Sequence, residues 1–122
     1  MINLQEKSPR ILVIGDLIVD HYLWGSCERI SAEAPVQVVN IDRESLVLGG
    51  AGNVINNLKA LGAQVDVISV VGVCQISYEL RSLLKQIEVD TQYLIIEKKR
   101  VSSKKSRIIA AQQQVVRYDR ET

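Results

Sequence analysis

Two aspartates near the start of the chain are the first residues whose type and spacing suit chemistry. The apolar run RILVI occupies residues 10–14, Gly15 precedes Asp16, and Asp20 follows four positions later. Ligands of open α/β sheets bind beyond the carboxyl ends of the strands, which is where Asp16 would lie. Two carboxylates there would accept hydrogen bonds from sugar hydroxyls, whereas a metal site lacks a third acidic residue at suitable spacing. The alternative is a turn aspartate and a solvated aspartate without a ligand.

A glycine-rich turn precedes an amphipathic run in the segment LGGAGNVINNLKALG, residues 48–62. The start of a helix offers unpaired backbone N–H groups and a partial positive charge. Gly49 and Gly50 would let a ligand approach this backbone because no Cβ intervenes, and Asn53 would add a donor and an acceptor. The pattern matches neither GxGxxG nor GxxxxGK[ST], so it does not indicate a nucleotide. A tight turn without a ligand is the alternative.

A basic run, KKRVSSKKSR, occupies residues 98–107. In a strand that starts at Ser103, Lys105 and Arg107 would share one face, and the residues that alternate with them would take the other. Arg100, Lys105 and Arg107 would then suit an anionic group such as a sugar phosphate. A solvated charged loop and a nucleic-acid patch are the two alternatives.

The composition of the 122-residue chain favours one globular domain and argues against several partners. A net charge of +1, one Trp and no Phe give little support for nucleic acid. The apolar stretches are too short to cross a membrane, and the first residues do not resemble a signal peptide, so we expect a cytoplasmic protein. Cys27 and Cys74 lack any zinc-type spacing and are interpreted as small buried hydrophobic residues. The only histidine, His21, is expected near a site but not as a base.

The elements that must position these residues alternate between strand and helix. Apolar runs predict a strand at 10–16 that is buried on both faces, and further strands at 63–72 and 91–97. Gly62 is expected to end the first helix. Two apolar stripes at helical spacing predict the helices: Val54, Ile55, Leu58 and Leu61 in the first, and Ile76, Leu80, Leu83, Leu84 and Ile87 in the second. This order predicts an α/β fold with parallel strands.

Three extended segments do not fit that alternation. They cover residues 19–26, 36–44 and 104–119, and each mixes apolar with polar residues. The last one divides at residues 112–113 into two runs that suit a hairpin. We therefore expect a small separate sheet attached to one edge of the α/β core.

Four stretches together resemble the N-terminal part of the ribokinase-like (PfkB) sugar kinases: GDLIVDHYLWG, RISAEAPVQVV, LGGAGNVINNLKALG and KSRIIAAQQQVVRYDRE. The resemblance runs from about Arg10 to Glu121. Its stretches most specific to the heptose branch are RISAEAPV (29–36) and QQVVRYD (113–119). It implies a partial Rossmann-type sheet with helices, in which the extended segments form a β-sheet lid. Residues 1–122 would be the N-terminal portion of a kinase domain, without its C-terminal ATP-binding half.

The same resemblance implies an activity and a site. Enzymes of this branch phosphorylate D-glycero-β-D-manno-heptose 7-phosphate at the anomeric oxygen, with ATP and Mg²⁺, on the route to ADP-heptose and the lipopolysaccharide core. The aspartates and the helix start would bind the sugar, and the basic residues would meet its 7-phosphate. The implied site comprises Asp16, Asp20, Gly49, Gly50, Asn53, Arg100, Lys105 and Arg107. The lid would close over the sugar and build a homodimer.

The sequence also departs from the family pattern. Ile55 stands where a small residue is preferred, Cys74 where Asp is usual, and Val101 where Pro is common. The GAGD segment, which carries the catalytic base in the family, has no counterpart, so we expect no catalytic residue, no ATP or Mg²⁺ site and negligible kinase activity in this chain alone. The alternative to a kinase fragment is a non-catalytic module for sugar binding or lid-mediated dimerisation.

Overall fold

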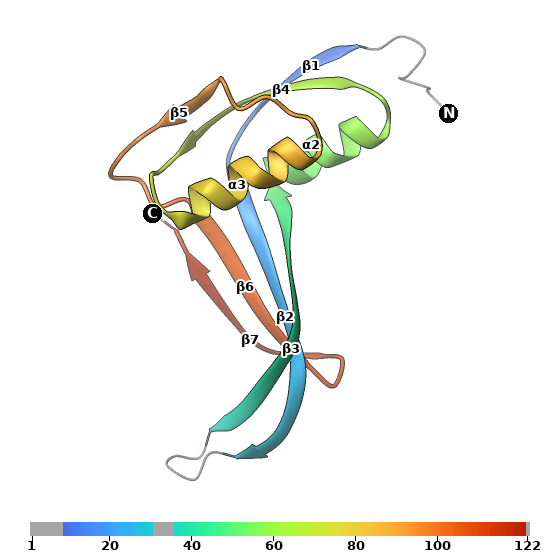
Figure 1. Ribbon diagram of the computed structural model, residues 1–122, viewed down its shortest axis with the longest axis vertical. Helices are drawn as coiled ribbons and strands as arrows, with labels where there is room; N and C mark the ends of the chain where they lie inside the picture. The colour runs from blue at the N-terminus through green and yellow to red at the C-terminus, as the bar shows by residue number, and fades with distance from the viewer. Residues whose placement is uncertain (1–8, 31–35, 122) are drawn as a thin grey trace.

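The computed structural model describes residues 9–30 and 36–121, and within them seven strands form two sheets (Figure 1). A parallel sheet has the order β1-β4-β5 and consists of β1 (Arg10–Ile14), β4 (Gln64–Val71) and β5 (Leu94–Ile96). A mixed sheet, here called the lid sheet, has the order β3-β2-β6-β7 and consists of β2 (Leu17–Ile30), β3 (Gln37–Gly50), β6 (Ser103–Ala110) and β7 (Gln113–Arg120). The predicted α/β fold with a separate sheet is therefore confirmed.

Two helices, α2 (Ala51–Ala60) and α3 (Gln75–Gln86), pack on one face of the parallel sheet. Alternate residues of β4 are buried, and they share a core with Ile55 of α2 and with Leu80 and Leu84 of α3. The apolar stripe predicted for α3 is confirmed. Gly62 follows α2 with a φ of 96°, a conformation that favours glycine, which confirms the predicted end of that helix.

The opposite face of the parallel sheet is uncovered by the described residues, so the prediction that strand 10–16 is buried on both faces is wrong. Leu12 is 52 % exposed and Ile14 is 72 % exposed, while Ile11 and Val13, which alternate with them, are half-buried. The cause is that both helices lie on the other face. A continuous apolar run indicates a strand, but it does not reveal which elements cover each face.

The stripe predicted for α2 is only partly correct. Val54 and Leu61 are about half exposed, at 50 % and 47 %. The helix instead packs through Gly52 and Ile55, which are both buried. A Cβ on Gly52 would lie 2.8 Å from the Cβ of Leu48, so this glycine lets the helix approach β3 closely.

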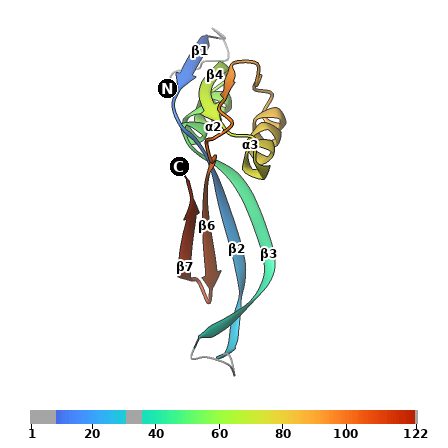
Figure 2. The ribbon, with the colours of Figure 1, turned by 90° about the vertical axis from the view of Figure 1, so that its left-hand side faces the viewer.

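The lid sheet extends away from the parallel sheet and its helices (Figure 2). Strands β2 and β3 are antiparallel, from the pair Leu17 and Gly50 to the pair Ile30 and Gln37. Strand β6 runs parallel to β2, and β7 returns antiparallel to β6, which confirms the predicted hairpin. Residues 31–35 of the heptose-branch stretch lie outside the described residues. No helix in the described ranges has the length and apolar character needed to cross a membrane.

Candidate functional site

The turn from β3 into α2 is fixed against the chain that leaves β1. Gly50 precedes the helix with a φ of 59°, and the backbone N–H of Ala51 donates a hydrogen bond to the Asp16 carbonyl over 2.9 Å. A Cβ on Gly50 would lie 2.6 Å from that same carbonyl oxygen. Among the described residues, no side chain caps the start of α2, and Asn53 is exposed in its first turn. The Ala51 N–H is thus satisfied by backbone, and no described side chain caps the other N–H groups of the first turn.

Asp20 lies directly against this turn. A Cβ built on Gly49 would sit 2.2 Å from Asp20 Oδ2, so the carboxylate occupies space that any other residue type would fill. Asp20 also accepts a 3.1 Å hydrogen bond from Nη1 of Arg107, and both side chains are about one fifth exposed. Asp20 thus contacts both Gly49 and Arg107.

The other predicted basic residues lie at the same end of the lid sheet. Lys105 is the register partner of Asp20 across the parallel pair of β2 and β6. Because side chains alternate along a strand, Lys105 shares the face of Arg107. Arg100 forms a 3.4 Å ion pair with Asp16. All eight predicted residues therefore cluster where the lid sheet meets the parallel sheet, a surface that we call the root site.

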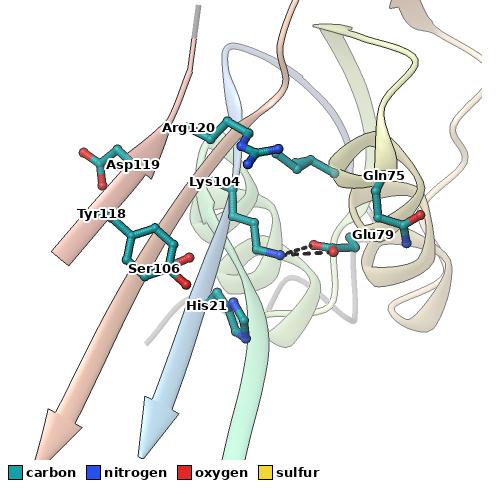
Figure 3. Close-up of a pocket in the computed structure, with 9 residues that line it drawn as sticks. His21, Gln75, Glu79, Lys104, Ser106, Tyr118, Asp119 and Arg120 are labelled. Atoms are coloured by element: carbon teal, nitrogen blue, oxygen red, sulfur yellow. Dashed lines mark hydrogen bonds and ion pairs between the residues drawn. The ribbon is translucent and has the colours of Figure 1, made fainter. Parts of the chain in front are cut away.

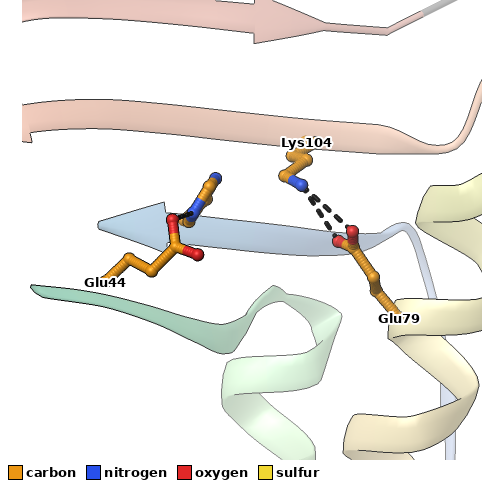
Figure 4. Close-up of polar contacts among 4 residues, drawn as sticks. Glu44, Glu79 and Lys104 are labelled. Carbon is orange, nitrogen blue, oxygen red and sulfur yellow. Dashed lines mark hydrogen bonds and ion pairs between the residues drawn. The ribbon is translucent and has the colours of Figure 1, made fainter. Parts of the chain in front are cut away.

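The opposite face of the lid sheet carries a different set of residues. His21 pairs with Glu44 over 3.0 Å, and Lys104 pairs with both carboxylate oxygens of Glu79, on α3, over 3.1 Å (Figure 4). His21 was expected near the predicted site, but alternation along β2 directs it away from Asp20 and toward α3.

Two hollows separate α3 from this opposite face. One has a volume of about 380 Å³ and includes His21, Lys104 and Arg120 in its lining (Figure 3). The other has a volume of about 580 Å³ and lies toward β3. Gln75 and Glu79 line both hollows. The Lys104–Glu79 ion pair therefore connects β6 to α3 at the boundary between the two hollows. Neither hollow is lined by the eight residues of the root site.

Aromatic residues extend the root site along β2, and the sequence analysis missed them. The Tyr22 and Trp24 rings are stacked, with centroids 5.7 Å apart and an interplanar angle of 20°. The guanidinium of Arg107 lies 5.3 Å from the centre of Tyr22, and that of Arg43 lies 4.3 Å from the centre of Trp24. The available signal was the alternation of Asp20, Tyr22 and Trp24 along one strand.

The two cysteines do not form a bonded or metal site. Cys27 is exposed, so the expectation that it is buried is wrong, whereas Cys74 is half-buried directly before α3. Burial raises the pKa of the Cys74 thiol, but hydrogen bonds from the N–H groups of Ser102, Ser77 and Ile76, together with a hydrogen bond between the thiol and the Ser77 hydroxyl, outweigh it and lower the pKa to about 7. Within the described part of the chain, no group of three or more His, Cys, Asp or Glu residues is arranged to hold a metal ion.

The structure combines an α/β core with a separate sheet, and a carboxylate lies beside a glycine-lined helix start. Residues 8–122 match the pfkB family of carbohydrate kinases, and the chain belongs to that family. It is 66 % identical over 116 residues to the bifunctional protein HldE of Aliarcobacter butzleri, which covers 95 % of this chain and 24 % of the relative. It is 55 % identical over 122 residues to HldE of Helicobacter hepaticus, covering all of this chain and 25 % of that protein. The chain thus spans about a quarter of the length of these relatives.

Solved structures agree on the fold. A carbohydrate kinase from Agrobacterium tumefaciens superposes with a TM-score of 0.70 at 20 % identity, over 92 % of this chain and 35 % of that one. A ribokinase from Arabidopsis thaliana, solved with ribose and ATP, gives a TM-score of 0.62 at 12 % identity, over 94 % of this chain and 36 % of its own. These similarities support the ribokinase-like fold, including the lid.

Proposed function

We propose that this chain forms the sugar-binding and lid part of a carbohydrate kinase that phosphorylates D-glycero-β-D-manno-heptose 7-phosphate at its anomeric oxygen. The observation that carries the proposal is the direct contact of the Asp20 carboxylate with Gly49, with Arg107 on its other side. This contact places a hydroxyl acceptor, backbone at a helix start and a cation on one surface. The similarity to HldE proteins over nearly the whole chain supports a heptose phosphate as the substrate.

Each part of the root site has a role in this proposal. Asp20 and Asp16 accept hydrogen bonds from sugar hydroxyls, which are good donors to carboxylates. The start of α2, with Asn53, contributes further hydrogen bonds to the sugar. Lys105 and Arg107 bind the 7-phosphate, since guanidinium and ammonium groups form charge-assisted hydrogen bonds with phosphate oxygens. Arg100, paired with Asp16, adds positive charge at the same surface.

In this proposal the described residues do not bind the phosphoryl donor. Transfer from ATP requires a positioned triphosphate, a metal ion and a base. The described residues contain no group of three or more His, Cys, Asp or Glu side chains that could hold a metal ion. We propose that the 122-residue chain binds the sugar phosphate without transferring phosphate to it, because the sequence has no counterpart of the GAGD segment that carries the catalytic base in the family.

Calorimetry with heptose 7-phosphate tests the proposal directly. We expect saturable binding by the wild-type chain and binding that is about 10- to 100-fold weaker for D20N, since a hydrogen bond to a charged group contributes about 1.5–3 kcal/mol. E44Q is the matched control, because Glu44 is an exposed carboxylate on the opposite face of the lid sheet. Absence of heat at millimolar ligand, from a chain shown by circular dichroism to be folded, would reject the sugar site.

A second candidate function is association through the lid sheet without catalysis. Strand β7 lies at the edge of that sheet and is exposed at every position, including Val115, Val116 and Tyr118. Exposed edge strands pair readily with other chains. Sedimentation equilibrium distinguishes this function, because a strict monomer at high concentration would exclude it.

A further inference from the structure

Charged side chains and aromatic rings form a continuous row on the face of the lid sheet that carries the root site. The row starts at Asp20 and passes through Arg107, Tyr22 and Trp24 to Arg43, and every neighbouring pair is in contact. Tyr22 and Trp24 are half-buried, whereas Arg43 at the outer end is exposed. The row therefore leads from the proposed sugar site outward along β2.

Two residues of this row contact Arg107, and a bound sugar would compete with only one of these contacts. The first is Asp20, which pairs with Nη1 over 3.1 Å. In the proposed function Asp20 also receives sugar hydroxyls, so this pair competes with the substrate. The second is the Tyr22 ring, 5.3 Å from the Arg107 guanidinium carbon. A ring face attracts a cation without using the N–H donors that a phosphate needs.

Trp24 in turn restricts Tyr22. The two rings are stacked on successive positions of one strand face, and the guanidinium of Arg43 covers Trp24 at 4.3 Å. A ring held in this way is a rigid support, because a stacked aromatic side chain has few alternative rotamers.

We propose that Tyr22, held in place by Trp24, is a positioning residue that keeps Arg107 directed at the phosphate end of the bound sugar phosphate. The inference rests on the proposed function of the root site. It assigns Tyr22 a role in selecting phosphorylated over unphosphorylated sugar, because the ring acts through Arg107 alone. A purely structural role for Tyr22 would affect both ligands equally.

The test compares two ligands and three variants of the 122-residue chain by calorimetry. For Y22L we expect affinity for heptose 7-phosphate to fall about 3- to 30-fold, in line with the usual strength of cation–π contacts, while affinity for unphosphorylated heptose changes less than twofold. Y22F retains the ring and should keep the affinity for both ligands within twofold. Y118L is the matched control, because Tyr118 lies on the opposite face and lines a hollow. Equal loss of both ligands in Y22L, or no loss of either, would overturn the proposal.

A ligand-free measurement separates this proposal from the proposed function. The NMR signal of the Arg107 side-chain Nε–H should show lower order in Y22L than in wild type or Y22F. If the wild-type chain binds no sugar phosphate, the proposed function fails, whereas unchanged order of Arg107 in Y22L rejects the positioning role itself. Should Y22L fail to fold, W24L provides the same comparison, with a smaller loss of Arg107 order expected and an unchanged order counting against the proposal.

Discussion

At the scale of single residues, the root site depends on Gly49, because the Asp20 carboxylate occupies the space that a side chain at position 49 would fill. Gly49 has no Cβ, and Asp20 uses that space while it pairs with Arg107. An alanine at position 49 would meet both Oδ2 and Cγ of Asp20, at 2.2 and 2.8 Å. The methyl group would therefore displace the Asp20 carboxylate, whose Oδ1 pairs with Arg107.

This geometry predicts a change of sign in a double-mutant cycle. G49A should destabilise the wild-type chain by about 1 kcal/mol, because the loss of a charged hydrogen bond, about 1.5–3 kcal/mol, exceeds the entropic gain of about 0.4–1 kcal/mol from Gly→Ala. In a D20A background the obstruction is gone, and the same substitution should stabilise the fold by about 0.4–1 kcal/mol through the lower entropy of the unfolded chain. Urea unfolding of the four proteins measures both values. Equal effects of G49A in the two backgrounds would contradict the contact.

At this scale the sequence pattern predicted residues that lie near one another in the structure, and their role in binding a ligand stays a prediction. The glycines before the helix and the aspartates after the first strand suggested a common ligand, and they lie together. Alternation along residues 103–107 correctly separated Lys105 and Arg107 from Lys104. Tyr22 was missed because an aromatic residue in a strand usually indicates packing, and its role depends on Arg107, which is distant in sequence and adjacent only through β2–β6 pairing.

At the scale of elements, one ion pair connects α3 with the lid sheet across the gap. Lys104 and Glu79 are 21 % and 15 % exposed, and hollows lie on both sides of the pair. Apolar contacts join α3 to β2 and β3 in the shared core, and the ion pair adds a contact between α3 and β6. Because Lys104 precedes Lys105 on the same strand, this contact also fixes the strand that carries the root-site cations.

Removal of either partner should loosen the lid sheet. We expect E79Q and K104M each to lower the free energy of unfolding by about 1–2 kcal/mol, because the remaining charge stays partly desolvated. The exchange E79K/K104E should recover at least half of that loss. Amide hydrogen exchange should show faster exchange in β6 for the single variants. Unchanged exchange in β6 would mean that the pair does not hold the strand.

The elements themselves were largely predictable, whereas their surroundings were not. Both helices and the hairpin follow from local patterns that need no distant partner. The exposed Ile14 on β1 and Val54 on α2 show where this reasoning ends. Burial of an apolar side chain stabilises the fold, so its position in the sequence indicates a face that favours burial. Only the tertiary arrangement decides whether another part of the described chain covers that face.

At the scale of the whole molecule, the uncovered face of the parallel sheet is the main feature. Leu12, Ile14 and Ile95 are all more than half exposed there, on a chain that spans about a quarter of its HldE relatives. Contiguous exposed apolar residues on a sheet favour association with another surface.

This face predicts concentration-dependent self-association of the chain. We expect sedimentation velocity to show oligomers whose fraction rises with concentration, and I14K to reduce that fraction, because a charge on the face is costly to bury. V54K is the control, since Val54 is a similarly apolar exposed residue on α2. If V54K reduces association as strongly as I14K, the sheet face is not the contact surface.

The connections of the lid sheet to the rest of the molecule all lie at one end, before Leu17, after Gly50 and before Ser103 (Figure 1). The sheet is thus attached to the rest of the molecule at one end only, and its strands β2 and β3 have 14 residues each. At about 3.3 Å per residue such a strand spans about 45 Å, so a rotation of about 10° at the fixed end would displace the free end by about 8 Å. A spectroscopic label at the free end would therefore detect a rotation of the lid sheet whose displacement at Asp20 is too small to measure.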